Sequence, residues 1–307
     1  MAKPIVIAHR GASGERPEHT RSAYELAIEQ RCDYVEPDLV FSRDGVLVVR
    51  HENEIGATTD IRGRPEFADR RTIKTIEDAR VEGWFTEDFT LAELKTLRCR
   101  ERLPDLRPQN TRYDTLDEIL TLEELVALAR DAGRRRGRAV GLYIEMKHPS
   151  YFAALGFSMP SALAGVLRAH DLDRAEAAVI VECFDADAVK AMGALTDVRL
   201  GQLIGEADAR LTPSGLRDLA QHAHAIGIEK SLVTGALCAD AHAAGLQVHA
   251  WTYRPENAFL PPAYRFGKDP AEYGDLEREL ADALGKGVDG VFCDLPGVAR
   301  RVVNRTF

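Results

Sequence analysis

The sequence has 307 residues, of which 45% are hydrophobic and 29% charged, a composition typical of a globular protein with a sizeable core. Its formal net charge of −9 argues against nucleic acid or an anionic membrane surface as a partner of the whole molecule. Five widely spaced cysteines without a Cys-x-x-Cys pair indicate core residues in a reducing compartment and not a disulfide framework.

The start of the sequence bears on location. Met1-Ala2-Lys3-Pro4 leads directly into an apolar run, and the sequence contains neither a signal peptide of normal length nor a long apolar stretch. We therefore expect a cytoplasmic protein without stable membrane insertion, or a periplasmic one if a targeting segment has been removed. The sequence is also compatible with a homo-oligomer.

Short apolar runs alternate with stretches of helical spacing along the chain. In chain order we expect a strand over 5–8, a helix over 20–30, strands over 33–38 and 140–146, a helix over 161–170, a strand over 177–181, a helix over 186–194, a strand over 199–204, a helix from Pro213, a strand over 225–228, a helix over 235–244, a strand over 247–251, a helix over 271–284 and a strand over 288–292. A further helix is expected over 115–132, before the third strand.

The region after the second expected strand breaks this pattern. The turn Asp44-Gly45 predicts a hairpin over residues 39–50. Residues 52–110 combine many charges and several prolines with weak periodicity, so we expect an inserted segment with some helix over 90–97.

Eight apolar strands that alternate with helices indicate a parallel sheet buried on both faces. A TIM (β/α)8 barrel with a small insertion after the second strand accounts for this count, with residues 1–307 as a single domain. An open doubly wound sheet is the alternative, but no Gly-x-Gly-x-x-Gly motif follows the first strand.

Charged side chains gather at the carboxyl ends of the first three expected strands, where βα barrels carry their active sites. Glu36 and Asp38 are two residues apart on one strand, so both are expected to point the same way. With Glu145 they form an oxygen-only set that favours one hard divalent cation, Ca²⁺ or Mg²⁺. The alternative is a structural ion-pair cluster with Arg10 and Lys147.

Two histidines share this rim. His9 follows the first strand, and His51 ends the hairpin that rises from the second. A single histidine is more often structural, but two beside carboxylates suit general acid–base catalysis near neutral pH. Arg10 and Lys147 add two cations that match a phosphate group.

Apolar and polar residues at other strand ends are candidates for the substrate pocket. Phe184 and Trp251 end the fourth and seventh strands, and Gln202 lies on the fifth. Each can equally be core packing. Residues 254–270, rich in proline and aromatic residues, follow the seventh strand and form either a lid or a long loop.

Several motifs, in order along nearly the whole chain, carry a resemblance to a known family. They are His9-Arg10-Gly11-Ala12-Ser13-Gly14, Pro17-Glu18-His19-Thr20, Tyr34-Val35-Glu36-Pro37-Asp38-Leu39, Asp44-Gly45, His51-Glu52, Ile144-Glu145-Met146-Lys147, Cys183-Phe184-Asp185-Ala186-Asp187 and Gly290-Val291-Phe292-Cys293-Asp294. With this spacing the sequence resembles the glycerophosphodiester phosphodiesterases, and most of all their bacterial periplasmic branch. Many members carry Asn where this chain has His19.

The resemblance implies a TIM barrel with one divalent cation held by Glu36, Asp38 and Glu145. It implies that the two histidines form the acid–base pair and that Arg10 and Lys147 contact the phosphate. It also implies that the insertion caps the mouth of the barrel, and it places Glu18 near the metal site as a supporting residue.

The function implied is metal-dependent hydrolysis of small glycerophosphodiesters, such as glycerophosphocholine or glycerophosphoethanolamine, to sn-glycerol 3-phosphate and an alcohol. One alternative is a phospholipase D-like enzyme that acts on lysophospholipids or sphingolipids and needs an apolar track for the acyl chain. Another is a catalytically inactive barrel that only binds phosphate esters.

Overall fold

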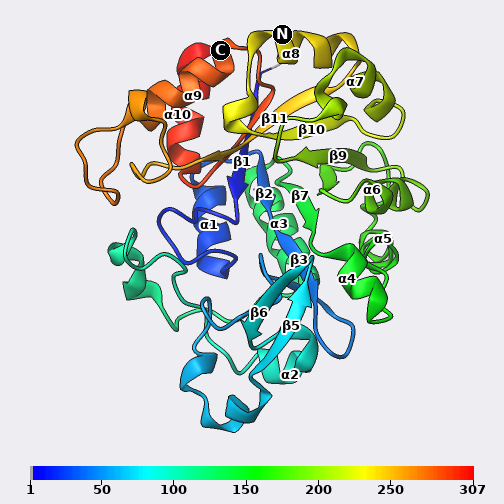
Figure 1. The fold of residues 1–307 in the computed structure, drawn as a ribbon, viewed down its shortest axis with the longest axis vertical. Coiled ribbons are helices and arrows are strands. Elements are labelled where there is room, and N and C mark those ends of the chain that lie inside the picture. Colours follow the sequence, from blue (N-terminus) through cyan, green and yellow to red (C-terminus); the bar gives the residue numbers. More distant parts are fainter. Residues whose placement is uncertain (1–2) are drawn as a thin grey trace.

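The computed structural model describes residues 3–307, and a closed ring of parallel strands forms its centre (Figure 1). The ring consists of β1 (Ile5–His9), β2 (Tyr34–Glu36) with its continuation β3 (Asp38–Phe41), β7 (Gly141–Met146), β8 (Val179–Cys183), β9 (Arg199–Ile204), β10 (Ala225–Glu229), β11 (Gln247–Tyr253) and β12 (Gly290–Cys293). Pairing of β2 with both β1 and β7 closes the ring. The predicted TIM barrel is therefore confirmed.

The second barrel strand is interrupted at Pro37, which separates β2 from β3. Proline has no N–H to donate to a neighbouring strand, so it disrupts the regular ladder here. Beyond it, β3 pairs with β7 in parallel, with Asp38 opposite Glu145. It also pairs antiparallel with β4 (Leu47–Val49), which confirms the predicted hairpin.

Helices surround the ring on its outer face (Figure 1). They are α1 (Arg21–Glu29), α3 (Leu122–Arg136), α4 (Pro149–Ala154), α5 (Met159–Ala169), α6 (Ala186–Gly193), α7 (Pro213–Leu219), α8 (Gly235–Ala243), α9 (Leu276–Gly285) and α10 (Pro296–Thr306). In the described part of the chain, no helix is long and apolar enough to cross a membrane.

Two helices begin later than the sequence predicts, and their caps explain why. The helix expected from residue 115 begins at Leu122, because Thr121 and Glu124 form a capping box that starts it there. The helix expected from residue 271 begins at Leu276, after the cap residue Asp275.

The segment between β4 and α3 leaves the ring and carries a separate two-stranded sheet, seen at the bottom of Figure 1. This sheet pairs β5 (Thr72–Ile76) with β6 (Ala79–Gly83), and the short helix α2 (Leu91–Leu94) follows it. Buried aromatic residues, among them Phe85 and Phe89, belong to the part of the segment that follows β6.

Side chains inside the barrel form layers, because alternate residues of each strand point inward. One apolar layer consists of Ile7, Tyr34, Tyr143, Ile180 and Phe292. On β1, β2, β7 and β8 the residue two positions after the apolar one also points inward and lies nearer the carboxyl end of the barrel. These four residues are His9, Glu36, Glu145 and Glu182. The fold thus places four polar side chains directly above an apolar plug.

Candidate active site

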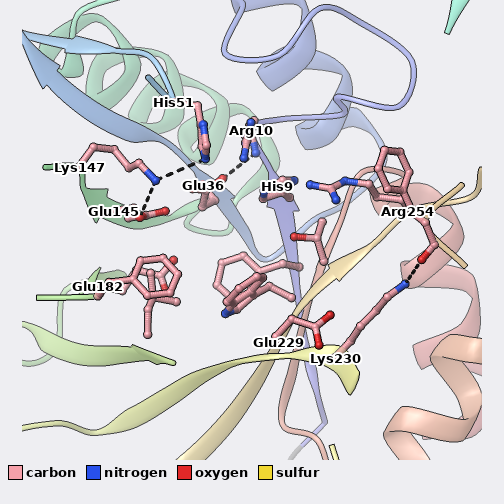
Figure 2. Close-up of a pocket in the computed structure, with 16 residues that line it drawn as sticks. His9, Arg10, Glu36, His51, Glu145, Lys147, Glu182, Glu229, Lys230 and Arg254 are labelled. Atoms are coloured by element: carbon pink, nitrogen blue, oxygen red, sulfur yellow. Dashed lines mark hydrogen bonds and ion pairs between the residues drawn. The ribbon is translucent and has the colours of Figure 1, made fainter. Parts of the chain in front are cut away.

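A cavity of about 280 Å³ opens at the carboxyl end of the barrel (Figure 2). Each of the eight barrel strands contributes to its lining, with His9, Glu36, Glu145, Glu182, Leu203, Glu229, Trp251 and Phe292 in strand order. Arg10, His51 and Lys147 also line it. The structure therefore brings together six of the seven residues predicted to do the chemistry, and Asp38 lies just behind them.

The acidic side chains form a compact buried group. Oxygens of Glu36, Glu145 and Glu182 lie within 4.8 Å of one another. Asp38 is fully buried, and its Oδ2 accepts a hydrogen bond of 2.8 Å from His19 Nε2. Glu182 was not predicted, although it stands opposite Glu145 in the pairing of β8 with β7.

The acids repel one another, and burial adds to the cost of their charges. Burial, followed by the charge of Asp38, raises the pKa of Glu36 well above its ordinary value. Burial also raises the pKa of Glu145 to about 8, although the Lys147 ammonium opposes this. Burial and the charge of Glu145 likewise raise the pKa of Glu182.

This group fits a hard divalent cation. Among the residues described, Asp38 Oδ1 and Glu182 Oε2 are buried oxygens without a hydrogen-bond partner. Buried carboxylate oxygens without partners are costly, and a cation among them supplies the missing contacts. The donors are all oxygen, which matches Mg²⁺ or Ca²⁺ better than zinc.

His9 is oriented by a carboxylate behind it. Its Nδ1 lies 2.6 Å from Asp294 Oδ1, which leaves Nε2 to face the cavity when Nδ1 carries the proton. Asp294 is held in turn by Arg107 Nη2 at 2.6 Å and by Arg254 Nε at 3.2 Å. Burial and then the charge of Arg10 lower the pKa of His9 to about 3, so its imidazole is neutral in the folded protein.

His51 has a similar arrangement. Its Nδ1 lies 2.9 Å from Glu52 Oε1, and its Nε2 accepts a contact of 3.4 Å from Lys147 Nζ. Burial, then the charges of Arg10 and Lys147, lower the pKa of His51 to about 4. Two neutral imidazoles, each with a carboxylate on Nδ1, therefore line one cavity.

Arg10 and Lys147, the two cationic side chains expected to contact the phosphate, are held in place by acidic residues. Lys147 Nζ donates to Glu145 Oε1 at 3.0 Å, and the Arg10 backbone N–H donates to Glu36 Oε2 at 2.7 Å (Figure 2). Arg10 has a φ of 59°, which is uncommon for a residue with a side chain. Its Nη1 donates to both oxygens of Glu18 at 3.1 and 3.2 Å.

The structure places only two of the four residues predicted for the substrate pocket in the lining of the cavity. Phe184 and Trp251 line the cavity, and their rings make an edge-to-face pair with centroids 5.7 Å apart. Glu18 lies outside the lining and supports Arg10 from behind. Gln202 is wrong as a pocket residue, because it faces the outside of the barrel, where Nε2 donates to the carbonyl of Phe184 at 2.9 Å.

Among the site residues that were missed, Glu182 and Asp294 had a usable signal in the sequence. Glu182 is a lone acid inside an apolar run, on the same strand face as Ile180. Asp294 directly follows the eighth strand, at the functional rim of the barrel. Arg107 had no local signal, because it reaches Asp294 from the inserted segment.

Comparison with known proteins agrees with this geometry. The model of the glycerophosphoryl diester phosphodiesterase family matches residues 9–298. The chain belongs to this family. It is 32% identical over 331 aligned positions to a glycerophosphodiester phosphodiesterase of Arabidopsis thaliana, and the match covers 96% of this chain and 85% of the relative.

Solved structures share the family's fold. A Silicibacter pomeroyi protein superposes with a TM-score of 0.76 at 22% identity, covering 99% of this chain and 94% of the other. A phosphodiesterase of Oleispira antarctica, solved in complex with the product sn-glycerol-3-phosphate, gives a TM-score of 0.70 at 23% identity, with coverages of 98% and 97%. The resemblance found in the sequence is confirmed.

Proposed function

We propose that this protein hydrolyses glycerophosphodiesters to sn-glycerol 3-phosphate and an alcohol, with one divalent cation and two histidines. The observation that carries the proposal is the pair of neutral imidazoles, His9 and His51, that line one cavity with a buried group of acids. Membership of the phosphodiesterase family and the product complex of the Oleispira antarctica relative support the reaction and its product.

Glu36, Asp38 and Glu145 are proposed to hold the cation, and Glu182 adds a fourth acid within reach of the group. When bound, Mg²⁺ or Ca²⁺ stabilises the negative charge that develops on the phosphoryl oxygens. The charge of the cation offsets the repulsion among the acids and favours their ionised forms, which opposes the effect of burial on the pKa values of Glu36 and Glu145.

Arg10 and Lys147 complete the binding of the diester. Both side chains are nearly buried and both line the cavity, so they contact a phosphate in a site with little competing water. Arg10 offers a planar guanidinium whose position is fixed by Glu18, and Lys147 offers an ammonium fixed by Glu145.

The histidines move the protons. A bare Nε2 on one imidazole takes a proton from the attacking hydroxyl, which belongs either to water or to the glycerol of the substrate. If the glycerol hydroxyl attacks, the alcohol leaves with formation of a cyclic phosphate, and a water molecule then opens the ring to sn-glycerol 3-phosphate. The other imidazole, which is neutral at rest and must first take a proton from solvent, gives that proton to the oxygen of the departing alcohol. Asp294 and Glu52 stabilise the positive charge that forms on His9 and His51, respectively.

The test is turnover of glycerophosphocholine before and after removal of divalent cations by a chelator. We expect activity to disappear on chelation and to return when Mg²⁺ or Ca²⁺ is added back. Full activity in the chelated protein would contradict the role of the acids. Faster turnover of lysophosphatidylcholine than of glycerophosphocholine would favour the phospholipase D-like alternative.

A further inference from the structure

Another histidine lies beside the active site, and the proposed reaction does not use it. His148 directly follows Lys147, whose side chain lies next to His51 in Figure 2. Its own side chain is only 10% exposed and lies outside the lining of the cavity. Both ring nitrogens contact acids from distant parts of the chain: Nε2 lies 3.0 Å from Glu52 Oε2, and Nδ1 lies 2.8 Å from Glu77 Oε1.

These two contacts determine the protonation state of His148. A neutral imidazole has one N–H group and one bare nitrogen, so it can donate to only one of two carboxylates. The imidazolium donates to both, and each hydrogen bond is then assisted by opposite charges. Burial lowers the pKa of His148, but the hydrogen bonds to Glu52 and then Glu77 outweigh burial and raise this pKa above its ordinary value. His148 is therefore a nearly buried cation between two acids.

Glu52 connects His148 to His51. Its Oε2 accepts from His148, and its Oε1 lies 2.9 Å from His51 Nδ1, so each oxygen of the carboxylate is held by one imidazole. Burial opposes ionisation of Glu52, but the hydrogen bonds from His148 and His51, and the nearby charge of Lys147, hold its pKa well below the ordinary value. Because this carboxylate is 49% exposed, it can turn away from His51 once His148 no longer holds it.

Glu77 connects His148 to the inserted segment. It lies in the two-residue turn between β5 and β6, where φ is 46° for Glu77 and 69° for Asp78. Positive φ at both positions is typical of the tight turn that joins two antiparallel strands. Most residues of the two strands are exposed, so burial stabilises this hairpin only weakly. The ion pair with His148 attaches the turn of the hairpin to the rim of the barrel.

The backbone of His148 is strained. Its φ of 47° and ψ of 45° lie in the left-handed region, which is uncommon for a residue with a side chain. His148 is also the N-cap residue of α4, but its side chain makes no capping hydrogen bond there. A strained residue persists where its surroundings hold it, and such residues cluster at functional sites. Here the two acids hold the ring.

We propose that His148 is a positioning residue: as an imidazolium it binds Glu52 and Glu77 at once, and so makes the orientation of His51 depend on the attachment of the β5–β6 hairpin to the barrel. This inference rests on the proposed function, in which His51 moves a proton. The neutral ring keeps only one of its two partners. The attachment is therefore complete below the ordinary pKa of 6.5 and is lost as the pH rises through the raised pKa of the folded protein.

The first test is NMR of the histidine side chains, which does not depend on turnover. We expect two protons on the His148 ring near pH 7, where an unperturbed histidine is mostly neutral. The His51 Nδ1 proton should resonate downfield because it donates to Glu52, and His148→Asn should remove this downfield position. Asn adopts the left-handed backbone readily. His242→Asn is the matched control, because His242 pairs with Asp289 at 2.8 Å away from the cavity. A singly protonated His148, or an unchanged His51 signal in His148→Asn, would overturn the inference.

The second test follows kcat and KM for glycerophosphocholine against pH, with Mg²⁺ present. We expect His148→Asn to lower kcat by about tenfold, the effect of one hydrogen bond to a charged group, with little change in KM. His242→Asn should keep the wild-type kcat. Glu77→Gln keeps the contact with Glu52 but removes one charge that raises the pKa of His148. In this variant the NMR titration of His148 and the alkaline loss of kcat should move together to lower pH. Glu66→Gln, exposed in the same inserted segment, should move neither.

Two kinetic results would overturn the inference. One is an alkaline loss of kcat that stays at the wild-type pH in Glu77→Gln while the titration of His148 moves. The other is a higher KM with unchanged kcat in His148→Asn, because a contact that only supports the inserted segment would act on binding alone. If the wild type hydrolyses no diester but the NMR results are as expected, the proposed function is refuted, and the positioning of His51 by His148 still stands.

Discussion

Asp294 is the carboxylate that the proposed mechanism needs behind His9, and Asp294→Asn tests it without changing the size of the side chain. In the wild type, Asp294 Oδ1 lies 2.6 Å from His9 Nδ1, and Oδ2 accepts from Arg107 at 2.6 Å. An asparagine that keeps its oxygen toward Arg107 turns its NH₂ group toward His9. The imidazole must then accept at Nδ1 and carry its proton on Nε2, where it faces the cavity.

This change removes the base and also weakens the acid, because a neutral imidazole N–H gives up its proton poorly. We expect kcat to fall by about 10²–10⁴, the range of general acid–base catalysis and of the corresponding change in serine proteases. The fold should lose about 1–3 kcal/mol, the cost of hydrogen bonds to a charged group. The loss is limited because Arg107 keeps Glu256, 2.6 Å from its Nε.

The Asp294→Asn substitution should also alter how the free energy of unfolding depends on pH. Burial opposes ionisation of Asp294, but Arg107, Arg254 and His9 hold its pKa well below the ordinary value of about 3.9. Its charge therefore stabilises the fold above about pH 4, and this contribution is lost as the pH falls toward the folded-state pKa. We expect the free energy of unfolding of Asp294→Asn to depend less steeply on pH in this acid range than that of the wild type.

The assays are steady-state kinetics with glycerophosphocholine, ¹⁵N NMR of the histidine tautomers and denaturant unfolding at several pH values. Asp289→Asn is the matched control, because Asp289 pairs with His242 at 2.8 Å away from the cavity. The reasoning fails if Asp294→Asn keeps wild-type kcat, or if His9 retains its Nδ1 proton while activity is lost.

Three further changes test other parts of the molecule. Glu182→Gln should raise the Mg²⁺ concentration for half-maximal activity by about tenfold, the weaker end of the effect of residues around a metal site; an unchanged metal titration would remove Glu182 from the site. His51→Gln should lower kcat by about 10²–10⁴ while the circular dichroism spectrum stays that of the wild type; retained turnover would exclude the histidine from the chemistry. Phe152→Ala should cost about 3–5 kcal/mol in denaturant unfolding, because this ring is fully buried, whereas Phe266→Ala, 58% exposed, should change stability by less than about 0.5 kcal/mol.

The barrel could be predicted because its signal is local and repeated. Each apolar run is short enough for a strand, and each helix has spacing that a sequence window detects. Helix starts were less accurate, since the capping box of Thr121 decides where α3 begins and outweighs the apolar residues before it. The break at Pro37 was also overlooked, although proline in a central strand is a local signal.

The site residues that lie at the ends of the barrel strands could be predicted from the sequence. The errors at Gln202 and Arg107 have two different physical causes. Gln202 was misplaced because the alternation of the strand was not applied: Leu203 points inward, so Gln202 must point outward. Arg107 lies 187 residues from Asp294 in the sequence, and only the folded insertion brings the two together. Contacts of this kind depend on the packing of the whole chain.

The most direct measurement of the central claim is a ³¹P NMR time course of glycerophosphocholine with the protein and Mg²⁺ or Ca²⁺. The account predicts that the diester signal decays into that of sn-glycerol 3-phosphate, with release of choline. It also predicts that His9→Ala and His51→Ala each slow this decay. A phosphocholine signal in place of glycerol 3-phosphate, or no decay with either cation, would contradict the account.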